Sequence, residues 1–163
     1  MDEPVITRAG LKRLRQELER LKHDGRRAVA ERLRHAATSE ANPAQNVDYI
    51  DARQELVSLE ERIALLEHRL RSARVVAPRL GNGRVDVGER VRVRDLASGK
   101  KLEVELVGPL EGDLSAGRVS VVSPLGRALV GLRRGDVADV RAPGGGRSFK
   151  VLAVEPPNPA RAA

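Results

Sequence analysis

The residues best suited to chemistry lie between positions 36 and 52, in the stretch AATSEANPAQNVDYIDA. This stretch contains Glu40, Asp48 and Asp51 and no Lys or Arg, although the chain has a formal net charge of +7. Carboxylates hold hard divalent cations such as Mg²⁺, usually together with ligands from a substrate or a partner protein. The spacing of these acids gives no paired site. We therefore expect neither a cofactor nor a metal site of the chain's own.

Two long apolar patterns flank the acidic stretch and predict the elements that position it. The first begins at Leu11 and repeats at spacings of three and four; Gly25 interrupts it, and it resumes about one position out of phase. Such stripes are typical of helices that pack along a partner helix, and the short link favours an antiparallel hairpin over an intermolecular coiled coil. The second stripe is unbroken and consists of Tyr49, Ala52, Leu56, Leu59, Ile63, Leu66, Leu70 and Ala73.

Capping residues indicate where the two helices begin. Thr7 can accept a hydrogen bond from the first turn of a helix that we expect to span about residues 8–37. For the second helix, Asn42–Gln45 predicts an Asn cap, a Pro at the first helical position and a Gln that completes a capping box. This start would place Asp48 almost two turns inside the second helix.

The pattern changes after residue 74, where a turn-rich segment leads into a β-rich part. We place a hairpin domain at 1–77, a linker at 78–84, a β-domain at 85–156 and a loose tail at 157–163. The β-domain is predicted to be mostly antiparallel with one short helix, so the fold class is α+β. Its expected elements are the strands Arg90–Leu96, Lys101–Val107 and Arg118–Val122, the helix Arg127–Leu132, and the strands Val137–Arg141 and Ser148–Val154.

Composition limits the compartment and the partners. The 163-residue chain has no cysteine and no apolar run near the roughly 20 residues that span a bilayer, so we expect a cytoplasmic protein without a membrane partner. We also expect a monomer. Lys and Arg number 30 against 23 Asp and Glu, which favours either a nucleic-acid partner or a well-solvated surface. Tyr49 and Phe149 are the only aromatic residues, so a surface that stacks single-stranded bases is not expected.

No catalytic constellation is visible in the sequence. The three histidines form no metal-type pair, and Gly144–Gly146 lacks the lysine and the following helix of a phosphate loop. The serines have no nearby His/Asp signature. We therefore predict that the chain is not itself an enzyme.

Several short segments are each only weak evidence for a protein family, but their combination is specific. They are Thr7–Leu11 leading into Leu14–Leu18, Asn46–Tyr49 with Ala52–Arg53, Gly88–Val93, Ser123–Gly131 and Pro143–Gly145. In this combination the chain resembles the bacterial Gre transcript-cleavage factors, GreA and GreB, over nearly its whole length.

This resemblance implies a fold and a partner. The β-domain would be FKBP-like and would dock at the rim of the RNA polymerase secondary channel, here through Ser123, Pro124 and Leu125. Nucleic acid would be met only within the transcription complex. Prolyl isomerisation is not expected, because such sites are lined by aromatic rings. The hairpin would enter the channel and bring its tip to the catalytic Mg²⁺; the tip residues are Glu40, Asn42, Gln45, Asn46, Asp48, Tyr49 and Asp51.

The tip departs from the family pattern at the positions that carry the chemistry. Cleavage-competent members read G-D-L-K-E-N-A-E-Y there, and their Asp and first Glu help to hold a metal ion and a water that cut backtracked RNA. Counting back from Asn46, Gln45 replaces that Glu and Asn42 replaces the Asp. Asp48 matches the second Glu of the pattern. A neutral amide supplies no charge to attract a second metal ion or to activate its water.

The sequence therefore favours a polymerase regulator that occupies the secondary channel and inhibits transcription without efficient RNA cleavage. Glu40, Asp48 and Asp51 would act electrostatically at the Mg²⁺ of the polymerase. Two alternatives remain open. One is an active cleavage factor that uses Glu40 and Asp48 as its metal pair, and the other is a coiled-coil protein that binds nucleic acid without polymerase.

Overall fold

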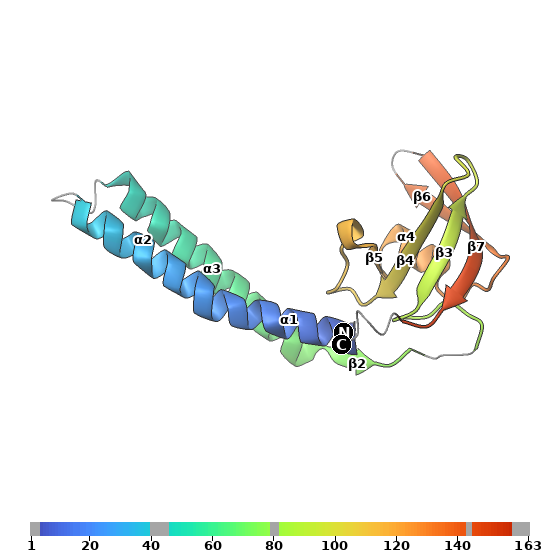
Figure 1. Cartoon of the computed structure of the whole chain (residues 1–163), viewed down its shortest axis with the longest axis horizontal. Coiled ribbons are helices and arrows are strands. Elements are labelled where there is room, and N and C mark those ends of the chain that lie inside the picture. The colour runs from blue at the N-terminus through green and yellow to red at the C-terminus, as the bar shows by residue number, and fades with distance from the viewer. Residues whose placement is uncertain (1–3, 40–45, 79–81, 143–144, 158–163) are drawn as a thin grey trace. The chain divides into compact units, whose positions relative to one another are not determined.

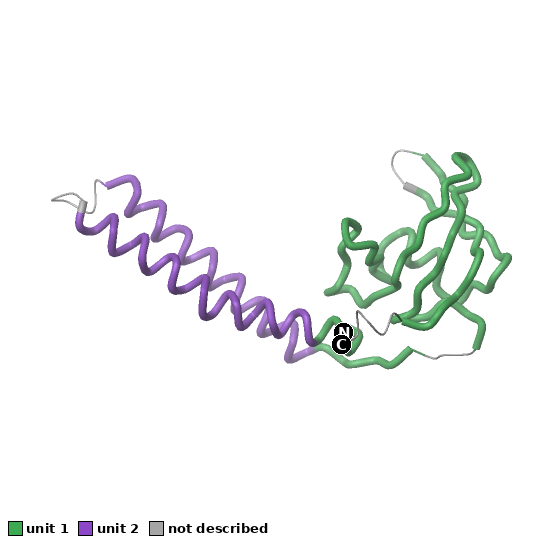
Figure 2. Tube along the Cα trace, viewed as in Figure 1, with its two compact units in different colours: residues 1–11, 73–163 green, residues 12–72 purple. Residues whose placement is uncertain are grey.

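The computed structural model describes residues 4–39, 46–78, 82–142 and 145–157 of the chain. The chain divides into two compact units, one of residues 12–72 and one of residues 1–11 with 73–163 (Figure 2). The sequence placed its boundary at residues 78–84, whereas here the first eleven residues group with the β-rich part. One unit is helical and the other is built on a five-stranded sheet, so the predicted α+β class is confirmed (Figure 1).

The helical unit is an antiparallel hairpin (Figure 1). Its first helix is continuous and consists of α1 (Arg8–Arg20), a π-helical turn η1 (Leu21–Gly25) and α2 (Arg26–Ser39). Its second helix is α3 (Val47–Ser72). The predicted hairpin is confirmed, and its first helix extends slightly beyond the expected end at residue 37. No helix within the described ranges is long and apolar enough to cross a membrane.

The π-helical turn explains the phase shift of the first apolar stripe. A π turn contains one residue more than an α turn, so the stripe moves by about one position at Gly25 and still faces α3. Leu18 before the turn and Val29 after it are both buried, as is Ile63 of α3. A Cβ on Gly25 would lie 3.1 Å from Leu59 Cδ1, so the missing side chain allows α3 to pack closely at this point.

Ion pairs accompany the apolar stripe. Arg26 forms a bidentate ion pair with Glu60, in which Arg26 Nε and Nη2 each donate a hydrogen bond to one carboxylate oxygen at 2.7 Å. The hydrogen bond from Arg26 lowers the pKa of Glu60, and Lys22 likewise lowers the pKa of Glu67. Within the described part of the chain, four ion pairs join the two helices, namely Glu17–Arg62, Lys22–Glu67, Arg26–Glu60 and Arg32–Glu55.

The second unit is built on a sheet with the strand order β5-β4-β3-β7-β6. Neighbouring strands are antiparallel except β4 and β5, which are parallel. The predicted strands are present, although β5 ends earlier and β7 begins earlier than expected. The strands are β3 (Arg90–Asp95), β4 (Lys101–Val107), β5 (Arg118–Ser120), β6 (Val137–Ala142) and β7 (Gly145–Glu155).

The core of this unit lies between the sheet and α4 (Pro124–Leu129). The sequence expected this helix at residues 127–132. It starts three residues earlier because Ser123 caps it, with Ser123 Oγ accepting a hydrogen bond from Gly126 N at 3.1 Å. A short 3₁₀ helix, η3 (Leu114–Ala116), precedes β5. The fully buried core side chains include Val85, Val91, Val93, Leu106, Val119, Leu129 and Val151.

Two short strands that the sequence did not predict, β1 (Val5–Thr7) and β2 (Arg74–Val76), pair in parallel. The buried carboxylate of Glu111 holds β1 in place. It accepts hydrogen bonds from Thr7 N at 2.7 Å, from Thr7 Oγ1 at 2.6 Å and from Gly108 N at 3.1 Å. Because a buried carboxylate is costly unless it is hydrogen-bonded, this cluster ties β1 to the loop after β4.

The contact around Glu111 leaves no space for two additional side chains. A Cβ on Gly10 would lie 1.7 Å from Glu111 Oε2, and one on Gly108 would lie 1.9 Å from Val5 O. Thr7 Oγ1 accepts a hydrogen bond from Gly10 N at 2.9 Å, so the predicted cap at the start of the first helix is confirmed.

Acidification is expected to weaken the hairpin through Glu60. Because Arg26 lowers the pKa of Glu60 in the folded state, the ion pair stabilises the fold at pH values above 4.5, the usual pKa of a Glu carboxyl group. This stabilisation is lost as the pH falls through the lower pKa that Glu60 has in the folded state. Glu60→Gln should therefore lower the thermal midpoint slightly at about pH 7 and leave it unchanged at about pH 2, as followed by circular dichroism. The control Glu61→Gln should have no effect at either pH. An equal effect of Glu60→Gln at both pH values would contradict this assignment.

Candidate functional site

The closed end of the hairpin is built around Asn46, which is polar and only 5% exposed. Asn46 Nδ2 donates a hydrogen bond to Ala36 O in the last turns of α2, at 2.8 Å. Asn46 Oδ1 accepts one from Tyr49 N in the first turn of α3, at 3.2 Å, and Ile50 N donates to Asn46 O at 3.1 Å. One side chain therefore caps α3 and fixes its start against α2.

This cap corrects the predicted start of the second helix. The sequence assigned the start to Asn42–Gln45, which lies outside the described residues together with Glu40. The described helix begins at Val47 with Asn46 as its cap, so Asp48 lies in the first turn of α3 and not almost two turns inside it. A carboxylate in this turn interacts favourably with the helix dipole. A signal for the correct cap was present, because Asn46 lies three residues before Tyr49, the first residue of the unbroken apolar stripe.

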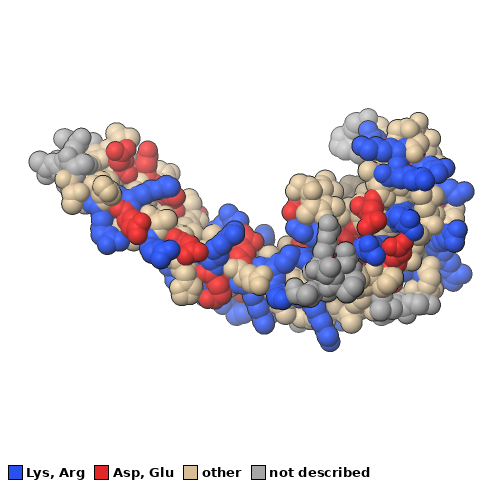
Figure 3. Space-filling model, in the orientation of Figure 1, with Lys and Arg blue, Asp and Glu red and all other residues tan. Residues whose placement is uncertain are grey.

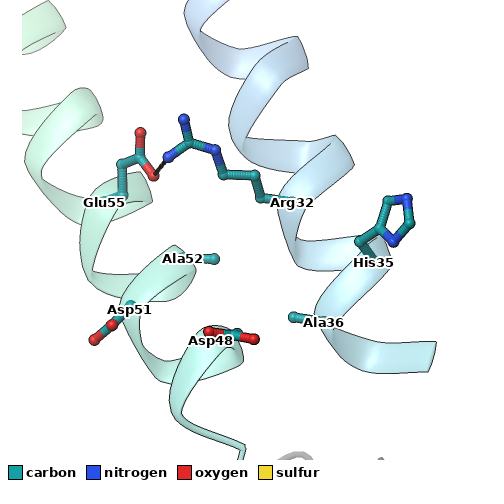
Figure 4. A pocket seen from close by; sticks show the side chains of 7 residues that line it. All are labelled: Arg32, His35, Ala36, Asp48, Asp51, Ala52 and Glu55. Carbon is teal, nitrogen blue, oxygen red and sulfur yellow. Dashed lines mark hydrogen bonds and ion pairs between the residues drawn. The ribbon is translucent and has the colours of Figure 1, made fainter. Parts of the chain in front are cut away.

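An open pocket of about 420 Å³ lies between α2 and α3 next to this cap (Figure 4). Arg32 and Glu55 form an ion pair within it. Asp48 points toward α2, whereas Asp51 points away from it (Figure 4). Both carboxylates are exposed, and neither has an ion-pair or hydrogen-bond partner among the described residues. The pocket is lined by Arg32, His35, Ala36, Asp48, Asp51, Ala52 and Glu55.

The two carboxylates do not converge on one point. Among the described residues, no group of three or more His, Asp or Glu side chains is placed to hold a metal ion. Asp48 and Asp51 are instead available to a cation or a cationic group that a partner supplies. The predicted contact of Glu40 and Asp48 with a partner's Mg²⁺ stays a prediction, because Glu40 lies outside the described residues.

The predicted docking residues, Ser123, Pro124 and Leu125, form the start of α4. Ser123 Oγ donates a hydrogen bond to Ser120 O at the end of β5, at 2.7 Å. A Cβ on Gly126 would lie 2.0 Å from the same oxygen, so the helix start packs directly against this backbone. Pro124 is exposed and Leu125 is half-buried against the core. The segment is therefore a firmly held surface feature, and its docking role stays a prediction.

Comparison with known proteins gives matches to two family models. Residues 4–75 match "Transcription elongation factor, N-terminal", and residues 80–156 match "Transcription elongation factor, GreA/GreB, C-term". A "Transcription elongation factor GreA" from Acidiphilium cryptum is 40% identical over 159 residues, which cover 94% of this chain and 98% of that protein. One of the same name from Ralstonia nicotianae is 39% identical over 152 residues, covering 92% of this chain and 96% of that protein.

Solved structures with similarity include GreA factor homolog 1 (Gfh1) of Thermus thermophilus. It is 33% identical, and the alignment covers 94% of this chain and 99% of that chain. The TM-score is 0.42, which is too low to support an argument about fold or function.

The relatives overturn one prediction. The absence of a catalytic constellation led to the prediction that the chain is not an enzyme. Many relatives are named "Transcription elongation factor GreA", which conflicts with a flat exclusion of an enzymatic role, so that prediction is wrong. The prediction failed because it rested only on the lack of a complete catalytic site within this one chain.

Two substitutions of Asn46 should separate its two hydrogen-bonding roles. Asn46→Ser keeps a cap acceptor but is too short to reach Ala36 O, so it should cost about 1 kcal/mol of stability. Asn46→Ala also removes the cap and should cost about 1 kcal/mol more. Chemical denaturation of the full chain measures both values. If Asn46→Ser unfolds as the unchanged chain does, the bond to α2 contributes nothing to the closed end.

Proposed function

The chain belongs to the GreA/GreB family of transcription elongation factors, and on this basis we propose that it binds RNA polymerase and acts on it during elongation. In this proposal the hairpin enters the secondary channel and brings the start of α3 to the catalytic centre. The segment Ser123–Leu125 docks at the rim of the channel. The chain works as a monomer in the cytoplasm and meets nucleic acid only within the transcription complex in this role.

The observation that supports this proposal is a pair of unpaired carboxylates in the first turns of α3. Asp48 and Asp51 are exposed and have no partner within the described chain, whereas Glu55 and Glu60 further along α3 are held in ion pairs. The 26 residues of α3 span roughly 39 Å at about 1.5 Å per residue. A narrow hairpin of this length can carry two free negative charges to a site inside a channel.

The neutral residues of the tip define the expected effect on the polymerase. Cleavage-competent members of the family have an Asp and a Glu where this chain has Asn42 and Gln45. Without those two charges the tip holds a second Mg²⁺ weakly, so it stimulates RNA cleavage less than a member with both acids does. A hairpin in the channel still obstructs nucleotide entry. The proposed net effect is slower nucleotide addition.

Stalled, backtracked elongation complexes test this function. The unchanged chain should slow nucleotide addition. Asp48→Asn with Asp51→Asn should relieve the slowing by roughly 5- to 10-fold, because the two charges help to hold the obstructing tip at the Mg²⁺ of the polymerase and an exposed charge interaction is worth about 1 kcal/mol. A matched control, Glu31→Gln with Glu61→Gln, removes the same charge from exposed positions elsewhere on the hairpin and should change little.

Two outcomes would contradict the proposal. If the chain releases 3′ RNA fragments as fast as a family member with both tip acids, the weaker-cleavage part is wrong. If the chain changes neither nucleotide addition nor cleavage, the proposed action on polymerase is wrong.

A further inference from the structure

The face of the sheet opposite the core carries three adjacent cations. In the strand register, Arg94 of β3 lies opposite Lys101 of β4 on one side and opposite Lys150 of β7 on the other. Directly opposed residues point to the same face, with Cβ atoms about 5 Å apart. All three residues are exposed. They form one line of positive charge across three strands, called here the cation row.

Among the acids that the structure describes, none forms an ion pair with the cation row. In the neighbouring positions of the same sheet face, Arg90 pairs with Glu103 and Glu155, and Arg92 also pairs with Glu155. By contrast, no side chain in the described ranges forms an ion pair or a hydrogen bond with a side chain of the cation row. Like charges directly opposite one another destabilise a sheet. The row therefore costs stability, which points to a role outside folding.

The surroundings of the cation row are also basic. Lys100 in the turn before β4 and Arg141 on β6 are exposed. The nearby acid Asp139 on β6 is engaged by Ser148, whose Oγ donates to Asp139 Oδ1 at 2.6 Å. Lys and Arg gather over the part of this unit that holds β6, β7 and the β3–β4 turn (Figure 3). An anionic partner of extended shape fits this surface.

We propose that the cation row binds the phosphate backbone of duplex DNA. Duplex DNA carries one negative charge per about 1.7 Å of its axis, and Lys and Arg that neutralise phosphates release condensed counterions. Adjacent strands lie about 4.8 Å apart, so the row spans roughly 10 Å, which is enough to meet more than one phosphate.

The aromatic content of the chain favours a duplex over a single strand. Single-stranded nucleic acid is bound by stacking its bases on aromatic rings. Phe149 is buried in the core of this unit, and the other aromatic residue, Tyr49, belongs to the hairpin. The cation row therefore offers charge without a stacking platform, and the contact is independent of base sequence. This contact does not rest on the proposed role of the hairpin tip.

Fluorescence anisotropy with a labelled duplex of about 20 base pairs tests the proposal on the full chain without polymerase. The triple variant Arg94→Gln, Lys101→Gln, Lys150→Gln neutralises the row. In a plot of log affinity against log salt concentration, it should make the negative slope shallower by about 2 to 3, because each phosphate contact contributes about 0.9 to the slope. Arg94→Gln alone should reduce it by about 1. The control Arg92→Gln removes the same charge two residues away, from an ion-paired position, and should leave the slope nearly unchanged.

Several results would overturn the proposal. If Arg92→Gln and Arg94→Gln reduce the salt dependence of DNA binding equally, only the net charge of the chain determines binding. Tighter binding to polyglutamate of the same charge would identify an acidic protein segment as the partner, and tighter binding to single-stranded RNA would exclude the preference for a duplex. Thermal unfolding gives an independent check. The triple variant should melt at a higher temperature, and a lower one would contradict the premise that the row costs stability.

Discussion

A single buried amide determines where the two helices of the hairpin meet. The Asn46 side chain donates a hydrogen bond to the backbone of α2 and accepts one from the backbone of α3, so the nitrogen and the oxygen of its amide both have partners. A buried polar group is costly when it is unpaired, which makes any alternative placement of α3 at this point unfavourable. The positions of Asp48 and Asp51 follow from this constraint, because both lie within the first turns that Asn46 caps. The proposed action of the tip depends on it.

The β-rich unit uses the same kind of constraint. Apolar stripes and strand alternation decide which face of an element is buried, but they set its position along its axis less strictly. In this unit the Glu111 carboxylate fixes β1 through Thr7 and Gly108, and the close approach at Gly108 leaves no room for a side chain. In each unit, therefore, a buried and satisfied polar side chain supplies the precision that hydrophobic packing alone does not.

Periodicity in the sequence was sufficient to predict the hairpin, the five strands of the sheet and the α+β class. The phase shift at Gly25 was visible, but its form as a π turn required the structure. The start of α3 was misassigned because Asn is a good cap at either position 42 or position 46, and the sequence does not show the tertiary bond from Asn46 to Ala36. β1 and β2 were missed because strands of three residues have no measurable period. The cation row was invisible, since it depends on the register of Arg94 with residues far along the chain.

In the proposed function, the closed end of the hairpin acts at the catalytic centre of RNA polymerase. The chain contains no cysteine, so a single cysteine at Val47, which is 67% exposed, can carry a reagent that releases hydroxyl radicals locally. In assembled elongation complexes, we expect cuts in the polymerase segments that line its catalytic centre. The same reagent at Leu114, which is 79% exposed in the β-rich unit, should cut elsewhere. Cuts from position 47 confined to the outer surface of the polymerase would contradict the account.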